Sequence, residues 1–159
     1  MYLSSATKEK LYNDSNSVIN VCFKAIKKSE FENLMSATED LKDRQAKAQH
    51  FCNYLCSVAK IPPLEVRVVN KPQPSTNDNM GRTRSKVLGT YTQGREVITM
   101  YNLTAKQQKV VAIKTFVGTL LHEFMHHYDI YYLNLPTSYH TKGFYMRLSD
   151  LQNKCKKVG

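Results

Sequence analysis

The sequence predicts a single α+β domain: N-terminal helices, a small, mainly antiparallel sheet of about three strands, a central helix and a C-terminal helix. Apolar residues recur at helical spacing before residue 60 and again from residue 113, and the segment between contains three strand-like runs. The 159 residues, 42% of them hydrophobic, suffice for one buried core. We expect one domain over residues 1–159, with a helical extension over residues 1–35 and a core over residues 36–156.

The first clear helix is predicted to begin at Ser36. The Ser36 hydroxyl can cap the helix while Glu39 reaches back in a capping box. The apolar positions form one stripe: Leu41, Ala48, Phe51, Leu55 and Val58. Two prolines, Pro62 and Pro63, end the helix because proline cannot continue its hydrogen-bond pattern.

Three runs in the middle of the chain predict strands. Residues 64–69 alternate between apolar and charged or polar side chains, as a half-exposed strand does. Residues 86–91 and 96–101 are rich in strand-forming residues and flank a short connection that contains Gly94, so we expect a hairpin. Together these runs predict the small sheet.

Positive charge dominates the composition. Lys and Arg number 23 against 13 Asp and Glu, for a formal net charge of +10, which favours contact with nucleic acid or another polyanion. Residues 71–85 are polar and longer than a usual connection, which predicts a mobile surface loop. Arg82, Arg84 and Lys86 are the candidate contacts with DNA phosphates or with an acidic substrate, although solvated surface charge is the simpler interpretation.

The four cysteines are irregularly spaced and contain no C-x-x-C pair, so they indicate neither a disulfide framework nor a zinc ribbon. Cys52 and Cys56 lie four positions apart on a predicted helix, where we expect buried, small apolar residues. No run approaches the roughly 18 to 20 apolar residues that cross a bilayer, and the first residues lack the order of a secretory signal. We therefore expect a soluble, cytoplasmic protein without membrane contact.

Two helices are predicted after the strands. Thr104 and Gln107 form a second capping-box pattern, and an apolar periodic segment follows it through Phe116 and Phe124. A final amphipathic helix is expected over about residues 141–156.

The central helix contains an H-E-x-x-H pattern formed by His122, Glu123 and His126. The two histidines lie about one helical turn apart, so both rings can reach one ion. Zinc accepts imidazole nitrogen readily, and a glutamate beside the first ligand can take a proton from water that attacks a carbonyl. Residues in phase with the histidines are small or polar, whereas the opposite stripe is apolar, which favours a site over core packing.

A catalytic zinc usually takes three protein ligands and leaves one position open. No glutamate follows Glu123, and the metzincin extension fails because Asp129 and Tyr132 stand where Gly and His are required. The remaining candidates for the third ligand are His127, Asp129, His140, Asp150 and Cys155.

Position along the chain separates these candidates. His127 points away from the ligand face of the helix, which favours a packing or surface role. Asp129 shares the ligand face but sits farther along, so we expect it to orient a ligand imidazole. His140 lies beyond the helix, after Pro136, where the chain has room to turn back, and it is the best third ligand.

The segments LHEFMHHYD (121–129) and SYHTKGFYMRL (138–148) resemble the SprT-like metallopeptidases, which include the Spartan DNA–protein crosslink proteases. Members of that family carry H-E-x-x-H on a helix and a third histidine beyond it, commonly with an aromatic residue four positions later, as Phe144 follows His140. The resemblance covers roughly residues 45–155. It implies a zincin-like fold, ligation of one zinc ion by His122, His126 and His140, and Glu123 as the general base.

The resemblance also implies a docking strand for an extended substrate at a sheet edge. The expected docking residues are Val97, Ile98, Thr99, Met100 and Tyr101. The sequence departs from the family pattern in two places. Thr141 stands where glycine often follows the third histidine, with Gly143 two positions later, and no C-terminal zinc ribbon is present, which bears on DNA targeting and not on the core chemistry.

The leading hypothesis is a zinc metallopeptidase that hydrolyses peptide bonds of a protein or peptide substrate, with DNA-associated proteins implied by the resemblance. The alternative is a basic nucleic-acid-binding protein with a structural, non-proteolytic zinc site; hydrolysis of a non-peptide bond is a weaker third option. Three tyrosines near the motifs, Tyr128, Tyr139 and Tyr145, are not assigned to oxyanion stabilisation.

Overall fold

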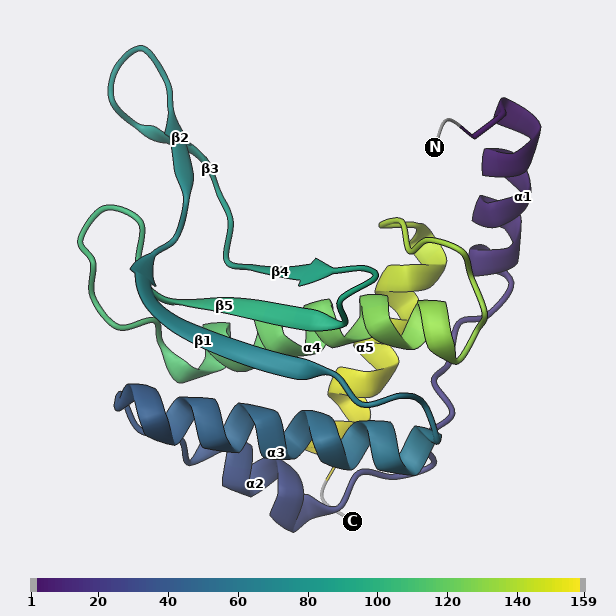
Figure 1. The fold of residues 1–159 in the computed structure, drawn as a ribbon, viewed down its shortest axis with the longest axis horizontal. Coiled ribbons are helices and arrows are strands. Elements are labelled where there is room, and N and C mark those ends of the chain that lie inside the picture. The colour runs from purple at the N-terminus through teal and green to yellow at the C-terminus, as the bar shows by residue number, and fades with distance from the viewer. Residues whose placement is uncertain (1–2, 158–159) are drawn as a thin grey trace.

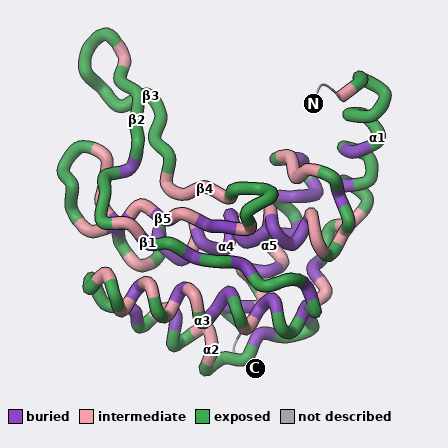
Figure 2. Tube along the Cα trace, viewed as in Figure 1, coloured by how far each residue is buried: buried purple, intermediate pink, exposed green. Residues whose placement is uncertain are grey.

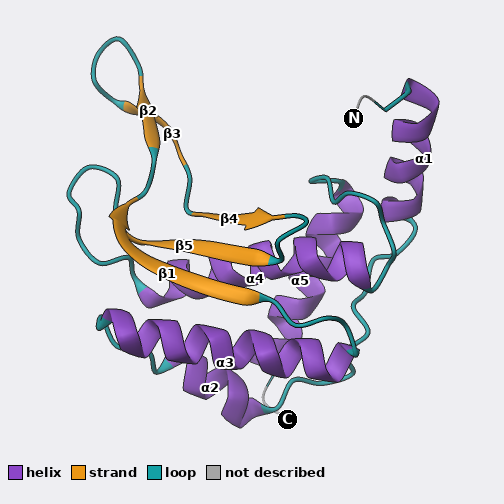
Figure 3. Cartoon of the chain, viewed as in Figure 1, coloured by secondary structure: helices purple, strands orange, loops and turns teal. Residues whose placement is uncertain are grey.

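Helices and strands follow one another in the predicted order in the computed structural model, which describes residues 3–157 (Figure 1, Figure 3). The elements are α1 (Ser5–Asn16), α2 (Lys28–Met35), α3 (Leu41–Ala59), β1 (Glu65–Pro72), β2 (Ser75–Asn77), β3 (Thr83–Lys86), β4 (Gly89–Thr92), β5 (Val97–Leu103), α4 (Ile113–Tyr131) and α5 (Lys142–Lys156). The predicted α+β class is confirmed.

Helix α3 begins later than predicted. Ser36 ends α2, and its hydroxyl donates a hydrogen bond to the Asn33 carbonyl. Asp40 caps α3 instead, because its carboxylate accepts a hydrogen bond from the Asp43 N–H at 3.0 Å. The predicted capping box at Ser36 is therefore wrong. Two residues that can cap a helix lie close together, and Ser36 ends the short helix α2 while Asp40 begins α3.

The three-stranded sheet has the strand order β1-β5-β4, with β1 parallel and β4 antiparallel to β5. The predicted hairpin between β4 and β5 is confirmed, but this sheet is mixed and not mainly antiparallel. The chain leaves the sheet after β1 and returns through β4, so β5 enters between them. Residues 97–101 form the central strand, and the prediction that they form an edge is wrong.

The two edges of this sheet differ in their accessibility. On the β1 edge, the side-chain amides of Gln45 and Gln49 in α3 exchange hydrogen bonds of 2.7 to 2.9 Å with the backbone of residues 64–68. Among the described residues, β4 pairs with β5 on one side and with no strand on the other. The β4 edge is therefore the one available to an added strand.

Residues 71–85, predicted to be a loop, include most of a second, two-stranded sheet. Strands β2 and β3 pair antiparallel and project away from the helices, exposed along both strands (Figure 1, Figure 2). Arg82 forms an ion pair with Asp78 at 2.9 Å, so part of the basic charge expected here is compensated. Arg84 and Lys86 are exposed on β3.

Helix α4 begins at Ile113, after Ala112, and not at Thr104. The Thr104 backbone N–H donates to the Lys109 carbonyl at 2.8 Å, and the Thr104 hydroxyl accepts from the Lys109 N–H, so the capping-box residues belong to a closed turn. The predicted apolar stripe is buried, with Phe116 and Phe124 at 1% and 0% exposure. Helix α5 follows its prediction closely, from a Thr141 cap to Lys156.

The hydrophobic core joins α2 and α3 to the sheet, α4 and α5 (Figure 2). Phe23 and Leu34, at 1% and 0% exposure, belong to it, so the segment expected as an extension contributes to the core. Burial raises the pKa of Cys56 to about 11 and that of Cys155 to about 12, which keeps both thiols protonated. In residues 3–157, no helix combines the length and apolar character that a membrane crossing requires.

Candidate metal centre

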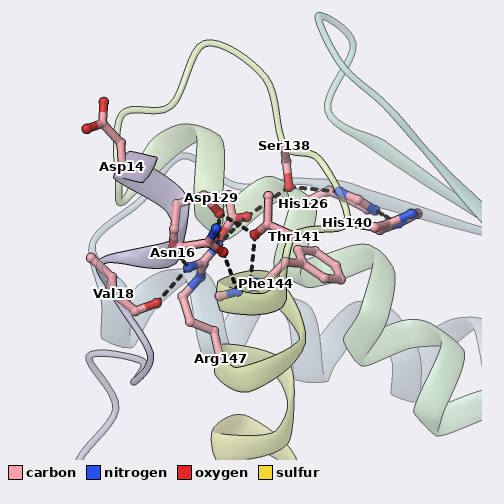
Figure 4. A network of polar contacts seen from close by, with 12 residues as sticks. Asp14, Asn16, Val18, His126, Asp129, Ser138, His140, Thr141, Phe144 and Arg147 are labelled. Atoms are coloured by element: carbon pink, nitrogen blue, oxygen red, sulfur yellow. Dashed lines mark hydrogen bonds and ion pairs between the residues drawn. The ribbon is translucent and has the colours of Figure 1, made fainter. Parts of the chain in front are cut away.

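Three imidazoles converge between α4 and the loop that precedes α5. His122 lies on α4. His126 lies on the same helix, and His140 comes from the loop between α4 and α5 (Figure 4). The Nε2 atom of His140 lies 3.0 Å from Nε2 of His122 and 3.1 Å from Nε2 of His126. Among the described residues, these three form the group that could hold a metal ion. The loop therefore returns the predicted third imidazole to the pair on the helix.

The donor atoms fit a zinc ion. Zinc binds imidazole nitrogen at about 2.0–2.1 Å, which in a tetrahedral site separates neighbouring ligand atoms by roughly 3.3 Å, close to the observed distances. Burial, together with His122 and His140, lowers the pKa of His126 to about 4, and burial with His140 lowers that of His122. Both rings are therefore neutral near pH 7, the form in which imidazole binds metals.

A hydrogen-bond relay fixes the orientation of His126. Ser138 Oγ donates its single proton to Asp129 Oδ2 at 2.9 Å, so toward His126 Nδ1, 2.9 Å away, it acts as an acceptor. His126 therefore carries its proton on Nδ1, and its Nε2 lone pair is directed at His140. Asp129, expected to orient a ligand imidazole, reaches His126 through Ser138, which the sequence analysis does not single out.

Arg147 of α5 holds Asp129 in place. Two guanidinium nitrogens donate to its carboxylate at 2.8 and 3.1 Å, and both side chains are fully buried. The guanidinium also donates to Ser15 and to the Val18 carbonyl, at the end of α1 (Figure 4). Burial raises the pKa of Asp129, whereas Arg147 acts in the opposite direction, and the bidentate contact favours the charged pair. One network thus joins α1, α4 and α5 to His126.

Phe144 supports the imidazoles from α5. Its ring, fully buried, stacks on His126 at 4.7 Å between centroids and meets His122 and His140 edge-on at 5.1 and 5.2 Å. The neighbouring position requires glycine, because a Cβ on Gly143 would collide with the end of α1. The aromatic residue and the displaced glycine noted in the sequence therefore have packing roles beside the site.

Glu123 is nearly buried, at 8% exposure, yet it makes no hydrogen bond or ion pair with any residue that the structure describes. Burial raises its pKa to about 7. Its side chain lines two cavities beside the imidazoles, of ≈470 and ≈310 Å³. Burying a carboxylate without a partner costs stability, so packing does not explain this residue. A carboxyl that exchanges protons near pH 7 suits general-base chemistry.

Strand β4 runs beside the candidate centre, and its residues line both cavities. The strand lies close to α4 because Gly89 has no side chain; a Cβ there would lie 3.0 Å from Thr119 Cγ2. Farther along, the His127 Nε2–H donates to the Pro62 carbonyl, so its Nδ1 accepts a hydrogen bond from the Tyr91 hydroxyl at 2.8 Å. The open edge of the sheet therefore borders the three histidines.

The remaining candidate ligands lie elsewhere. His127 is buried and serves packing, as one of its two predicted roles states. Asp150 accepts hydrogen bonds from the Val21 N–H and from Lys154, and Cys155 lies in the core. Cys52, with Cys56 beside it, is likewise a core residue, as expected.

The three tyrosines have different positions. Tyr128 accepts a hydrogen bond from the Cys22 N–H, and Tyr139 packs against Tyr12 of α1. Tyr145 is 48% exposed, and its ring centroid lies 5.8 Å from that of His140. Only Tyr145 of these three is placed to reach a ligand bound at the imidazoles.

Replacing Ser138 by alanine should weaken zinc binding by about 10- to 100-fold, because the Nδ1–H of His126 loses its acceptor. Titration against a fluorescent zinc chelator measures the effect. Ser138→Thr, which keeps a hydroxyl, should restore most of the affinity. Equal affinity of Ser138→Ala and wild type would show that the relay does not contribute to binding.

Comparisons with protein families, with curated proteins and with solved structures found no match.

Proposed function

We propose that this chain is a zinc-dependent metallopeptidase. The observation that carries the proposal is that three converging imidazole nitrogens lie beside Glu123, which is 8% exposed and has no partner among the described residues. Structural zinc sites usually complete the coordination with four protein ligands, whereas catalytic sites use three and leave one position open. Three histidines bordered by two cavities correspond to the second arrangement.

His122, His126 and His140 would hold the ion. Zinc bound by imidazoles supplies Lewis acidity, which activates water and polarises a carbonyl group. Glu123 accepts the proton of the attacking water and later donates it to the leaving amine. Its raised pKa suits both transfers, because the same carboxyl must take up and release a proton near neutral pH.

An extended peptide would bind by adding a strand to β4. Within residues 3–157 this edge pairs with no further strand and borders the imidazoles, whereas the β1 edge is occupied by the glutamines of α3. Main-chain hydrogen bonds to β4 would hold a peptide bond beside Glu123, and the two cavities would receive neighbouring side chains. The docking role expected for residues 97–101 thus passes to the adjacent strand of the same hairpin.

The resemblance to SprT-like metallopeptidases supports the same reading and suggests DNA-associated proteins as substrates. The net charge of +10 and the exposed Arg84 and Lys86 agree with an approach to DNA. The same charge favours the alternative, a nucleic-acid-binding protein with a structural zinc site. Glu123 favours catalysis, since a structural site has no need of a glutamate that is largely withdrawn from water and has no partner among the described residues.

Metal content tests the proposal first. Purified wild type should contain close to one zinc ion per chain, measured by elemental mass spectrometry, and should cleave an unfolded protein substrate. His140→Ala should bind zinc roughly 100-fold more weakly or worse, because loss of a supporting partner alone costs 10- to 100-fold. The cleavage activity should fall with the metal content.

His50→Ala is the matched control, since His50 is exposed and pairs with Glu30 far from the site in sequence. This variant should keep the zinc and the activity of the wild type. A wild type that binds no metal after zinc is supplied would refute the proposal, and zinc retained without any proteolysis would favour the structural site.

A further inference from the structure

Two cavities adjoin across α4. The first, of ≈470 Å³, contains His122 and Glu123. The second, of ≈520 Å³, lies between α2, α4 and α5. Gly118 and Gln152 line both, so the two cavities are neighbours, and together they are called here the Gly118 groove. The groove leads from the candidate metal centre to α2.

Packing does not explain the glycine at the junction. Gly118 lies inside α4, although glycine has the lowest helix propensity of all residues except proline. A Cβ at this position would meet no atom within 4 Å, so nothing in the fold requires its absence. Because Gly118 borders both cavities, a larger side chain at this position would project into the space between them.

The far cavity combines apolar walls with positive charge. Phe31, Met35, Val117 and Leu121 form the walls, and Lys114 and Lys156 line the same space. Neither lysine forms an ion pair or a hydrogen bond within the part of the chain that the structure describes. Nucleic acid phosphates would match the lysines but not the apolar walls. A peptide that carries an apolar side chain next to carboxylates matches both.

The geometry points to the Gly118 groove as a substrate subsite that selects an apolar side chain with adjacent acidic residues. This inference rests on the proposed function for the position of the scissile bond. From His122 to Gly118 and on to Lys114, α4 advances about 6 and then 12 Å, at 1.5 Å per residue. An extended peptide advances about 3.3 Å per residue, so the selected residues lie roughly two to four positions from that bond.

Binding to the Glu123→Gln variant tests the groove without requiring cleavage. The probes are a fluorescein-labelled peptide of alternating leucine and glutamate and its partner with lysine in place of each glutamate, compared by fluorescence anisotropy. The acidic peptide should bind. Gly118→Leu should weaken its binding by about tenfold or more, because the leucine side chain would fill the space that the peptide needs. Gly118→Ala adds only one methyl group, so its affinity for the acidic peptide should be closer to that of the Glu123→Gln protein.

Charge reversal isolates the lysines. Lys114→Glu and Lys156→Glu should each weaken the acidic peptide by about five- to tenfold and improve the lysine peptide. Lys71→Glu is the matched control: it changes the net charge equally but lies on β1, at the opposite edge of the sheet from β4, and should have the smallest effect.

Three outcomes would overturn the inference: no binding of the acidic peptide, equal binding of both peptides, or equal effects of Lys71→Glu and Lys114→Glu. These outcomes leave the metal proposal standing, because zinc content is measured separately. A protein that binds no zinc but passes the peptide tests would lose the peptidase proposal and keep a peptide-binding groove.

Discussion

Glu123→Gln should lose peptide hydrolysis by about 10²- to 10⁴-fold and keep its zinc, because the amide preserves the shape of the side chain but cannot take a proton from water. The three imidazoles that would hold the metal are untouched. The substitution also removes a buried carboxylate that has no partner among the described residues, so the unfolding temperature should stay level or rise. Steady-state cleavage, metal content and thermal unfolding on one preparation measure all three effects.

Glu32→Gln serves as the control, because its side chain is 63% exposed and lies on α2. It should leave activity unchanged. Activity retained in Glu123→Gln would remove Glu123 from the mechanism, and lost zinc would mean that the residue supports the ligands. A drop in stability would contradict the view that Glu123 is kept at a cost to the fold.

Arg147→Ala should lower the free energy of unfolding by about 3–5 kcal/mol, the usual cost of removing one partner from a buried ion pair. Asp129 would be left buried with Ser138 as its remaining partner, and the Ser15 and Val18 carbonyls would lose their donor. At about 2–4 °C per kcal/mol for a chain of this size, the unfolding temperature should fall by roughly 6–20 °C. Urea unfolding in the presence of a metal chelator measures the change.

Arg67→Ala is the matched control. Its partner Glu65 and Arg67 itself are 53% and 58% exposed, and exposed pairs contribute little, so the change should stay within about 0.5 kcal/mol. Combining Arg147→Met with Asp129→Asn should recover part of the loss, because no buried charge then remains unpaired. Equal effects of Arg147→Ala and Arg67→Ala would show that the buried network contributes little to stability.

Local spacing determined how the histidines of α4 are arranged. His122 and His126 share a face because a helix turns once in 3.6 residues, whatever surrounds it. The same period placed Phe116 and Phe124 in the core and directed His127 away from the other two histidines. Choosing His140 needed only the inventory of remaining ligand types and a chain reversal after the helix. These features depend only on residues close together in the sequence, so they could be predicted from it.

Capping signals were less reliable because they are local without being unique. The patterns at Ser36 and Thr104 both satisfy a capping box, yet α3 begins after Asp40 and α4 after Ala112. In each case the neighbouring structure determines where the helix begins. Ser36 already ends α2, and Thr104 is hydrogen-bonded to Lys109 within a turn. A hydroxyl three residues before a glutamate or glutamine therefore does not show by itself where a helix begins.

Strand order and the support of the ligands were decided by the tertiary structure alone. Which strand lies in the middle depends on pairings between segments far apart in sequence, so the open edge of the sheet could not be read from alternation within one strand. Ser138 and Arg147 lie within the segment 138–148, but nothing in that segment assigns a contact to either residue, and Gly118 lies in no motif. Their roles exist because α1, α4 and α5 meet around Asp129, and because two cavities adjoin where one helix has no side chain. The sequence by itself determined the ligand types and their helical phase, since both follow from local geometry, and packing decided what surrounds them.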